Sequence, residues 1–199
     1  MAVSYQKAYF LLSVADVKQL PPDKGLEVAI VGRSNAGKSS VLNRLTQVKG
    51  LARVSKTPGR TQMINIFVLD EKRRIADLPG YGFAKAPPTA QKKWQQTVDA
   101  YLRTRKSLQG MVVVMDIRHP LTPLDLQLLS YAEHQKLPVH ILLNKADKLS
   151  KNAALNTMYK VKAALRTYGN HISVQIFSVL KSIGVEELRK QLDEWYNDV

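Results

Sequence analysis

The chain has 199 residues, of which 30 are lysine or arginine and 16 are aspartate or glutamate, so its formal net charge at pH 7 is +14. With 45% hydrophobic and 23% charged residues it has the composition of an ordinary globular protein, which argues against disordered and fibrous classes. The absence of cysteine excludes disulfides, thiolate metal sites and a cysteine nucleophile, and the charge indicates a polyanionic partner.

Residues 1–25 read as a leader that ends in the Pro21-Pro22 turn, and we expect it to pack on a single domain spanning residues 26–199. The apolar stretch from Ala8 to Ala15 is far shorter than the ~20 residues that a membrane-spanning helix needs. It also lacks the features of a signal peptide, and Met1-Ala2 offers no glycine for myristoylation. We therefore expect a cytoplasmic protein without a membrane anchor.

Short apolar runs alternate with longer stretches of helical spacing, such as the row Trp94, Val98, Tyr101 and Leu102. This alternation predicts an α/β fold, a mostly parallel six-stranded sheet with helices on both faces. Only Asp70–Arg73 separates the second and third runs, so these should form a hairpin with one antiparallel edge strand. The runs are Glu27–Gly32, Met63–Leu69, Arg74–Leu78, Met111–Asp116, Val139–Asn144 and Ile172–Phe177.

A glycine-rich loop follows the first run and matches the P-loop spacing G-x-x-x-x-G-K-S, with an apolar helical pattern behind it. Its glycines let backbone amides surround a phosphate at a helix N-terminus. Lys38 would neutralise phosphate oxygens, and the Ser39 hydroxyl would bind Mg²⁺. A chance match is disfavoured because a strand precedes the loop and a helix follows, so we expect a P-loop NTPase. The expected nucleotide contacts are Gly32, Arg33, Ser34, Asn35, Ala36, Gly37, Lys38, Ser39 and Ser40.

A D-x-x-G run, Asp77-Leu78-Pro79-Gly80, ends the third expected strand. Asp77 can reach the Mg²⁺ shell, and the Gly80 amide can touch the γ-phosphate. Such a run alone mostly marks a strand end with a turn, but one hairpin after a P-loop it indicates an NTPase. The next residue is Tyr81, where a Ras-like enzyme has a water-orienting glutamine, so we expect slow intrinsic hydrolysis.

The run Asn144-Lys145-Ala146-Asp147 follows the fifth expected strand. An aspartate there can accept hydrogen bonds from guanine N1–H and the 2-amino group, whereas adenine would leave the carboxylate unpaired. Asn144 would brace the loops, and the Lys145 stem would cover one face of the base. Alternatively, Asp147 caps the next helix. The position behind the penultimate strand of a P-loop chain favours guanine, and hence GTP and GDP as ligands.

The basic stretch from Leu51 to Met63 lies where a GTPase has its first switch loop. A threonine there could bind Mg²⁺ only while the γ-phosphate is present, and loss of that contact on hydrolysis would produce a switch. Spacing alone leaves Thr57 and Thr61 as candidates. Arg53 and Arg60 are candidate charge donors to the phosphates, or contacts to RNA phosphates.

Four blocks of this sequence, Gly32–Ser40, Lys56–Gln62, Asp77–Ala84 and Asp116–His119, carry a more specific resemblance. Together they resemble the EngB family, also called YihA or YsxC. These are bacterial ribosome-biogenesis GTP-binding proteins among the Era-like (TrmE-Era-EngA-EngB-septin) P-loop GTPases. The similarity runs over nearly the whole chain from about Pro22. It implies a role in assembly of the large ribosomal subunit.

The resemblance also implies further site residues. It selects Thr61 as the Mg²⁺ ligand of the switch loop, alongside Ser39, and places the last base-contacting loop at Phe177, Ser178 and Val179. Val179 stands where the family has a second small residue. Asn35 resembles an asparagine with which some Era-like relatives hold K⁺ against the phosphates, so the expected catalytic residues are Lys38, Thr61 and Asn35. The implied switch-loop contacts are Gly59, Arg60, Thr61, Gln62 and Met63.

The basic residues gather around the expected nucleotide loops, since no acid occurs from Val28 to Leu69 or from Lys148 to Val185. One GTP needs only Lys38 and a magnesium ion, so most of this charge is left for a larger partner. We expect this partner to be ribosomal RNA. We also expect the protein to be a monomer. The alternative is a GTP switch that binds a protein or an anionic membrane, for example in cell division or signalling. A P-loop small-molecule kinase is disfavoured, because N-K-A-D has no place there.

Overall fold

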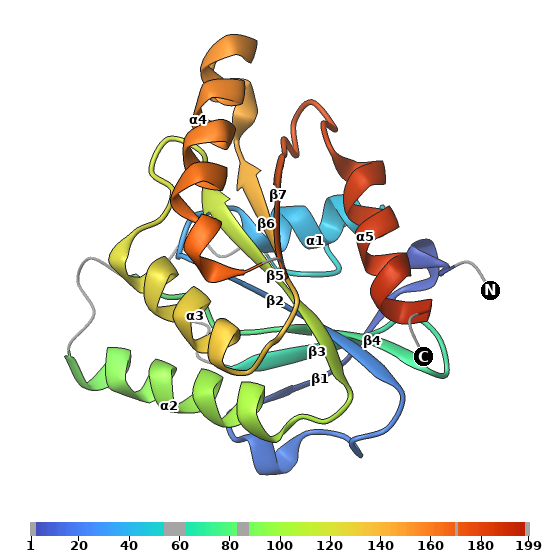
Figure 1. Cartoon of the computed structure of the whole chain (residues 1–199). Helices are drawn as coiled ribbons and strands as arrows, with labels where there is room; N and C mark the ends of the chain where they lie inside the picture. The colour runs from blue at the N-terminus through green and yellow to red at the C-terminus, as the bar shows by residue number, and fades with distance from the viewer. Residues whose placement is uncertain (1–2, 54–62, 83–87, 170, 198–199) are drawn as a thin grey trace.

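The computed structural model describes residues 3–53, 63–82, 88–169 and 171–197, except the side chain of Ala90. Within these ranges the strands form one sheet in the order β1-β3-β4-β2-β5-β6-β7, flanked by helices (Figure 1). The strands are β1 (Tyr9–Val14), β2 (Leu26–Gly32), β3 (Ile64–Val68), β4 (Arg73–Asp77), β5 (Leu108–Asp116), β6 (Val139–Asn144) and β7 (Ile172–Ile176). The helices are α1 (Lys38–Thr46), α2 (Pro88–Thr104), α3 (Pro123–His134), α4 (Lys151–Ala164) and α5 (Val185–Asn197).

The α/β fold class predicted from the sequence is confirmed, with two corrections to the sheet. Strands β4, β2, β5, β6 and β7 are parallel, and β3 runs antiparallel to β4. The sheet of the described residues has seven strands instead of six, because β1 pairs with the outer side of β3. The antiparallel strand β3 is therefore not the edge. The sequence pattern does not indicate β1, because Tyr9, Phe10 and Leu11 are all exposed and show no alternation of burial. A bulge also shifts the register between Phe10 and Leu12.

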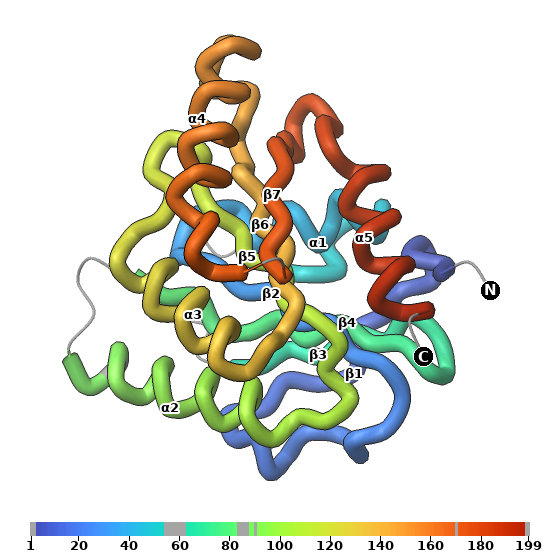
Figure 2. The backbone as a smooth tube through the Cα atoms, viewed as in Figure 1, coloured from blue at the N-terminus to red at the C-terminus, as the bar shows by residue number. Residues whose placement is uncertain are grey.

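Two cores lie on opposite faces of the sheet, and alternate residues of each central strand supply them. Helices cover both faces, α2 and α3 on one and α1 and α5 on the other (Figure 2). Ala29 and Val31 of β2 pack with apolar residues of α2, α3 and α4. Val28 and Ile30 pack with α1 and α5 on the other face. Period-2 alternation with apolar residues on both sides is what a covered parallel strand requires. Because β2, β5 and β6 are parallel, the loops at their carboxyl ends lie at one edge of the sheet.

Helix α2 shows how the helical stripe positions an element. Val98, Tyr101 and Leu102 are buried against the sheet, whereas Lys92 and Lys93 are exposed on the outer side. The helix is therefore amphipathic, as the spacing of its apolar residues predicts. In the described part of the chain no helix is long and apolar enough to cross a membrane.

A buried ion pair fastens the start of β2 to the end of α2. Both oxygens of the fully buried Glu27 carboxylate accept from Arg105, at 2.9 Å from Nε and 3.0 Å from Nη2, and Tyr101 Oη donates to Oε1 at 2.5 Å. Burial, and then the charge and hydrogen bond of Glu27, raise the pKa of Tyr101 well above its usual range. The hydroxyl thus remains a donor. Arg105 also donates to Pro21 O at 2.9 Å, which ties down the leader.

Candidate functional site

The glycine-rich loop connects β2 to α1 through backbone conformations that glycine and asparagine tolerate. Gly37 (φ 97°) is the N-cap residue of α1 and has no side chain to block the helix amides, and Asn35 (φ 65°) is also left-handed. A Cβ at Gly37 would come within 2.5 Å of Asn144 Nδ2. Glycine is therefore required here both by the backbone and by the neighbouring loop. The helix N-terminus remains open toward an anion.

Lys38 and Asp77 face each other at the centre of the site. Their side chains form a direct ion pair between the first turn of α1 and the end of β4, and the Asp77 residue is only 5% exposed. Asn65 Nδ2 of β3 donates to the other Asp77 oxygen at 3.3 Å. Ser39 follows Lys38 in the same helical turn. Hydroxyl and carboxylate oxygens with a lysine ammonium form a donor set suited to phosphate and to a hard cation.

The N-K-A-D residues contact the P-loop from β6. Asn144 Nδ2 donates to Ala36 O at 2.8 Å, and Lys145 Nζ donates to Asn35 O at 2.6 Å. Both contacts join loops more than 100 residues apart in the sequence, because β2 and β6 flank β5 in the sheet. These two side chains link the expected phosphate and base loops into one unit.

Asp147 is paired with the loop that the family resemblance indicates. Ser178 Oγ donates to Asp147 Oδ1 at 2.6 Å, and Ala146 N donates to Phe177 O at 3.1 Å. Asp147 is not the cap of the next helix, which was the alternative role. Ser150 is the N-cap of α4, where its Oγ accepts from Ala153 N at 3.2 Å. The Asp147 carboxylate is thus held by the Ser178 hydroxyl and does not cap α4.

The D-x-x-G segment is attached to the P-loop by its backbone. Tyr81 N donates to Gly32 O at 3.3 Å, and Ser34 N donates to Tyr81 O at 2.6 Å. Gly80 lies beside these bonds, where a Cβ would approach Gly32 O to 3.4 Å. Leu78 and Pro79 are buried. The segment therefore continues from β4 along the base of the glycine-rich loop.

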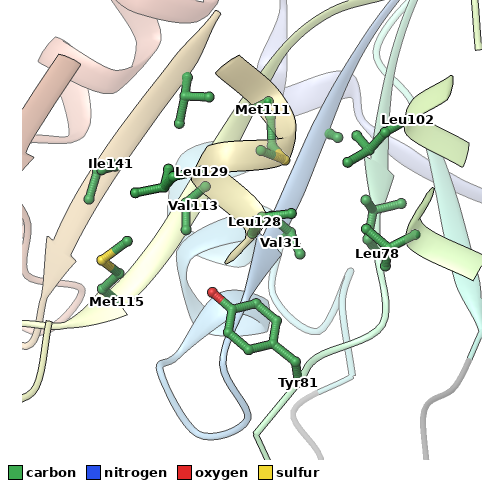
Figure 3. Close-up of a cluster of buried hydrophobic side chains, with 14 of the residues drawn as sticks. Val31, Leu78, Tyr81, Leu102, Met111, Val113, Met115, Leu128, Leu129 and Ile141 are labelled. Atoms are coloured by element: carbon green, nitrogen blue, oxygen red, sulfur yellow. The ribbon is translucent and has the colours of Figure 1, made fainter. Parts of the chain in front are cut away.

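The Tyr81 side chain turns into the core (Figure 3). It is 2% exposed, its hydroxyl donates to the buried Asp125 carboxylate, and its ring packs on Trp94 at a centroid distance of 4.9 Å. Trp94 Nε1 in turn donates to Pro79 O at 2.7 Å. Burial, and then the charge and hydrogen bond of Asp125, raise the pKa of Tyr81 well above its usual range. The side chain that follows D-x-x-G is thus held away from solvent.

Several expected site residues lie outside the described part of the chain. These include both candidate switch threonines and most of the implied switch-loop segment. Met63 is described, and it is exposed immediately before β3. Arg33 of the P-loop is exposed, and so is Arg53, the last described residue before residues 54–62. Among the expected site residues, those without a structural description are Thr57, Gly59, Arg60, Thr61 and Gln62.

Asp116 has no site role in the sequence analysis, and the structure places it beside Lys145 of the N-K-A-D run. Its carboxylate accepts from Lys145 Nζ at 3.1 Å and from Arg118 Nη2 at 2.7 Å. Burial alone would raise the pKa of Asp116, but hydrogen bonds from Arg118 and Lys145 hold it well below the usual range. Asp116 and Asn144 end neighbouring parallel strands in register. That adjacency was the available signal, because residues at paired strand ends meet at one sheet edge.

Comparisons with known proteins agree with this geometry. A family model described as 50S ribosome-binding GTPase matches residues 27–145. The GTP-binding protein EngB of Coxiella burnetii (strain RSA 331) is 53% identical over 195 residues, which cover 98% of this chain and 95% of that protein. The EngB protein of Aliivibrio fischeri (strain MJ11) is 54% identical over 194 residues, covering 98% and 90%.

Solved structures share the fold at lower identity. A crystal structure of an EngB GTP-binding protein aligns with a TM-score of 0.68 and 21% identity, covering 87% of this chain and 100% of that one. Era of Aquifex aeolicus bound to GDP·AlF4⁻ aligns with a TM-score of 0.67 and 23% identity, covering 86% and 57%. Fold and sequence together define a P-loop GTPase, a protein that binds guanine nucleotides and hydrolyses GTP. Within this class the chain belongs to the EngB family of GTP-binding proteins.

Proposed function

We propose that this GTPase is a slow switch in assembly of the large ribosomal subunit, acting as a cytoplasmic monomer that docks on ribosomal RNA. The observation that carries the proposal is the match of residues 27–145 to the 50S ribosome-binding GTPase model, which spans the P-loop and ends within the N-K-A-D run. The charge supports it, since the acid-free span from Val28 to Leu69 leaves Arg33 of the P-loop, Arg44 in the last turn of α1, and Lys49 and Arg53 behind that helix exposed. A surface of this kind attracts an RNA backbone.

In this proposal the phosphates bind between Gly32 and Ser40, and Lys38 exchanges its contact with Asp77 for the β- and γ-phosphate oxygens. The donor set fits Mg²⁺, since Ser39 and Asp77 offer hard oxygen ligands at the phosphate end of the site. Ser39 and Thr61 would be its protein ligands, with Asp77 in its shell. When bound, Mg²⁺ neutralises charge on the phosphate oxygens. The remaining expected contacts are Leu78, Pro79, Gly80 and Gly59–Met63.

The base in this proposal is held by Asp147 and by the loop at Phe177, Ser178 and Val179. The Ser178 hydroxyl, which donates to Asp147 at 2.6 Å, orients the carboxylate so that an oxygen can accept from guanine N1–H and the 2-amino group. Since backbone amides do the work in the last loop, Val179 leaves the contact to guanine O6 intact. Lys145 lies over the base face, and Asn144 holds Ala36 in place.

Slow hydrolysis and a K⁺ requirement lead to a direct test. Tyr81 is buried and cannot orient water, so we propose that Asn35 holds a K⁺ ion whose charge assists phosphate transfer. The hydrolysis rate in K⁺ buffer should exceed that in Na⁺ buffer by about 10-fold or more, and Asn35→Ala should remove the difference. Phosphate release under single-turnover conditions measures both. Equal rates in the two salts, together with an unchanged Asn35→Ala variant, would contradict this role.

The ribosomal partner is tested by co-sedimentation. With a non-hydrolysable GTP analogue the protein should pellet with large ribosomal subunits and not with anionic vesicles, and GDP should release it. Binding should weaken steeply between 50 and 200 mM salt, and Lys49→Ala should lower the salt slope by about 1. Lys190→Ala, on the acidic helix α5, is the matched control and should leave the slope unchanged. Vesicle binding without subunit binding would favour the membrane alternative.

A further inference from the structure

The motif Asp116–His119 has a carboxylate that is fully occupied by the nucleotide loops and its own turn. Asp116 Oδ1 accepts from Arg118 N and Nε, both at 3.0 Å, and Oδ2 accepts from Arg118 Nη2 at 2.7 Å. Lys145 Nζ lies 3.1 Å from Oδ2. The side chain of Asp116 is 18% exposed, compared with 43% for Arg118. The carboxylate thus lies under the guanidinium and reaches toward the N-K-A-D loop.

Lys145 is stretched between two fixed acceptors. Its ammonium contacts Asp116 on β5 and also donates to Asn35 O of the P-loop at 2.6 Å. Its backbone is left-handed, with φ 66°. A lysine stem has four rotatable bonds, so a lysine that is free before binding loses side-chain entropy when it becomes ordered on a ligand. Two acceptors at its end place the stem in one position beforehand.

We propose that Asp116 is a positioning residue for the guanine nucleotide, which holds Lys145 extended over the base and attached to the P-loop carbonyl of Asn35. Asp116 touches neither base nor phosphate and acts through Lys145. Arg118 supports it by a bidentate bond that orients the carboxylate and balances its charge. This inference rests on the nucleotide site proposed above, and it assigns a part to a motif for which the sequence offered none.

The test is a double-mutant cycle between Asp116→Asn and Lys145→Met, with affinity and release rate of fluorescent GDP and of a GTP analogue as readouts. Asp116→Asn keeps the shape of the side chain. It should weaken both nucleotides by the same factor, about 10-fold, mostly through faster release. In the Lys145→Met background the same substitution should change affinity less than about 2-fold. Arg118→Ala, which leaves the carboxylate charged, should cost about 3-fold.

Asp99→Asn is the matched control, because it removes an aspartate from the exposed 3.8 Å pair with Arg103 on α2. It should leave nucleotide affinity unchanged. If Asp116→Asn does not fold, Asp116→Glu replaces it in the cycle, and the moved carboxylate should show the same coupling. An Asp116 effect of equal size with and without Lys145, or none at all, overturns the positioning role alone. Failure of the unmodified protein to bind guanine nucleotide overturns the site itself.

Discussion

Replacing Asp147 with asparagine should change the base that this protein binds. The carboxylate would accept two guanine hydrogen bonds, and an asparagine amide presents a donor at one of those positions. Losing one hydrogen bond to a charged acceptor, worth about 1.5–3 kcal/mol, and the charge behind the other should together weaken GDP and GTP by about 100-fold or more. Xanthine has a carbonyl in place of the 2-amino group, so the asparagine N–H can donate to it. Xanthosine nucleotides should then bind better than guanosine nucleotides.

Titration of wild type and Asp147→Asn with GDP and XDP measures this reversal directly. Ser178→Ala removes only the hydroxyl that donates to Asp147 at 2.6 Å, so it should weaken GDP by about 5-fold without favouring XDP. Asp99→Asn should behave as wild type with both nucleotides. Unchanged GDP affinity in Asp147→Asn would show that the base is read elsewhere.

Arg105→Ala should produce the largest loss of stability. The substitution leaves the Glu27 carboxylate, which is 0% exposed, without its two charged hydrogen bonds at 2.9 and 3.0 Å. Removing one partner of a buried ion pair costs about 3–5 kcal/mol, because the remaining charge is uncompensated. For a chain of this size that is a fall in melting temperature of roughly 6–20 °C. The anchor on Pro21 O is lost as well.

Thermal and urea unfolding of Arg105→Ala and Arg103→Ala test this expectation. Arg103 lies two residues away on α2 and forms an exposed pair with Asp99 at 3.8 Å, so its loss should cost less than about 0.5 kcal/mol. Both variants remove an arginine side chain from the same segment, but Arg105 is buried and Arg103 is exposed. Equal destabilisation by both would mean that the Glu27 pair contributes nothing beyond its surface counterpart.

Much of the site could be predicted from local patterns. The P-loop spacing, D-x-x-G and N-K-A-D are contiguous runs, each attached to the end of an apolar strand, so residue order alone indicates where a phosphate and a base would lie. The alternation of buried strands and amphipathic helices likewise predicts the fold class. These features depend on chemistry within a few residues, which is what a sequence pattern records.

The leader strand shows where such patterns end. Tyr9, Phe10 and Leu11 are exposed at the sheet edge, so these residues of β1 do not alternate between buried and exposed. The segment is a strand because its backbone pairs with β3. Pairing of this kind joins residues far apart in the chain, such as Ser13 and Asn65, which are 52 positions apart. Local propensity carries no information about it, because the backbone partners come from elsewhere in the chain.

The sequence by itself determined the class of protein and the residues available for phosphate and guanine. The tertiary structure decided how these residues are held: Lys145 between Asp116 and Asn35, Asn144 on Ala36, and Tyr81 turned into the core on Asp125. The physical reason is the parallel sheet. It brings the ends of strands that are distant in sequence to one edge, where a side chain's partners are set by strand order and not by its sequence neighbours.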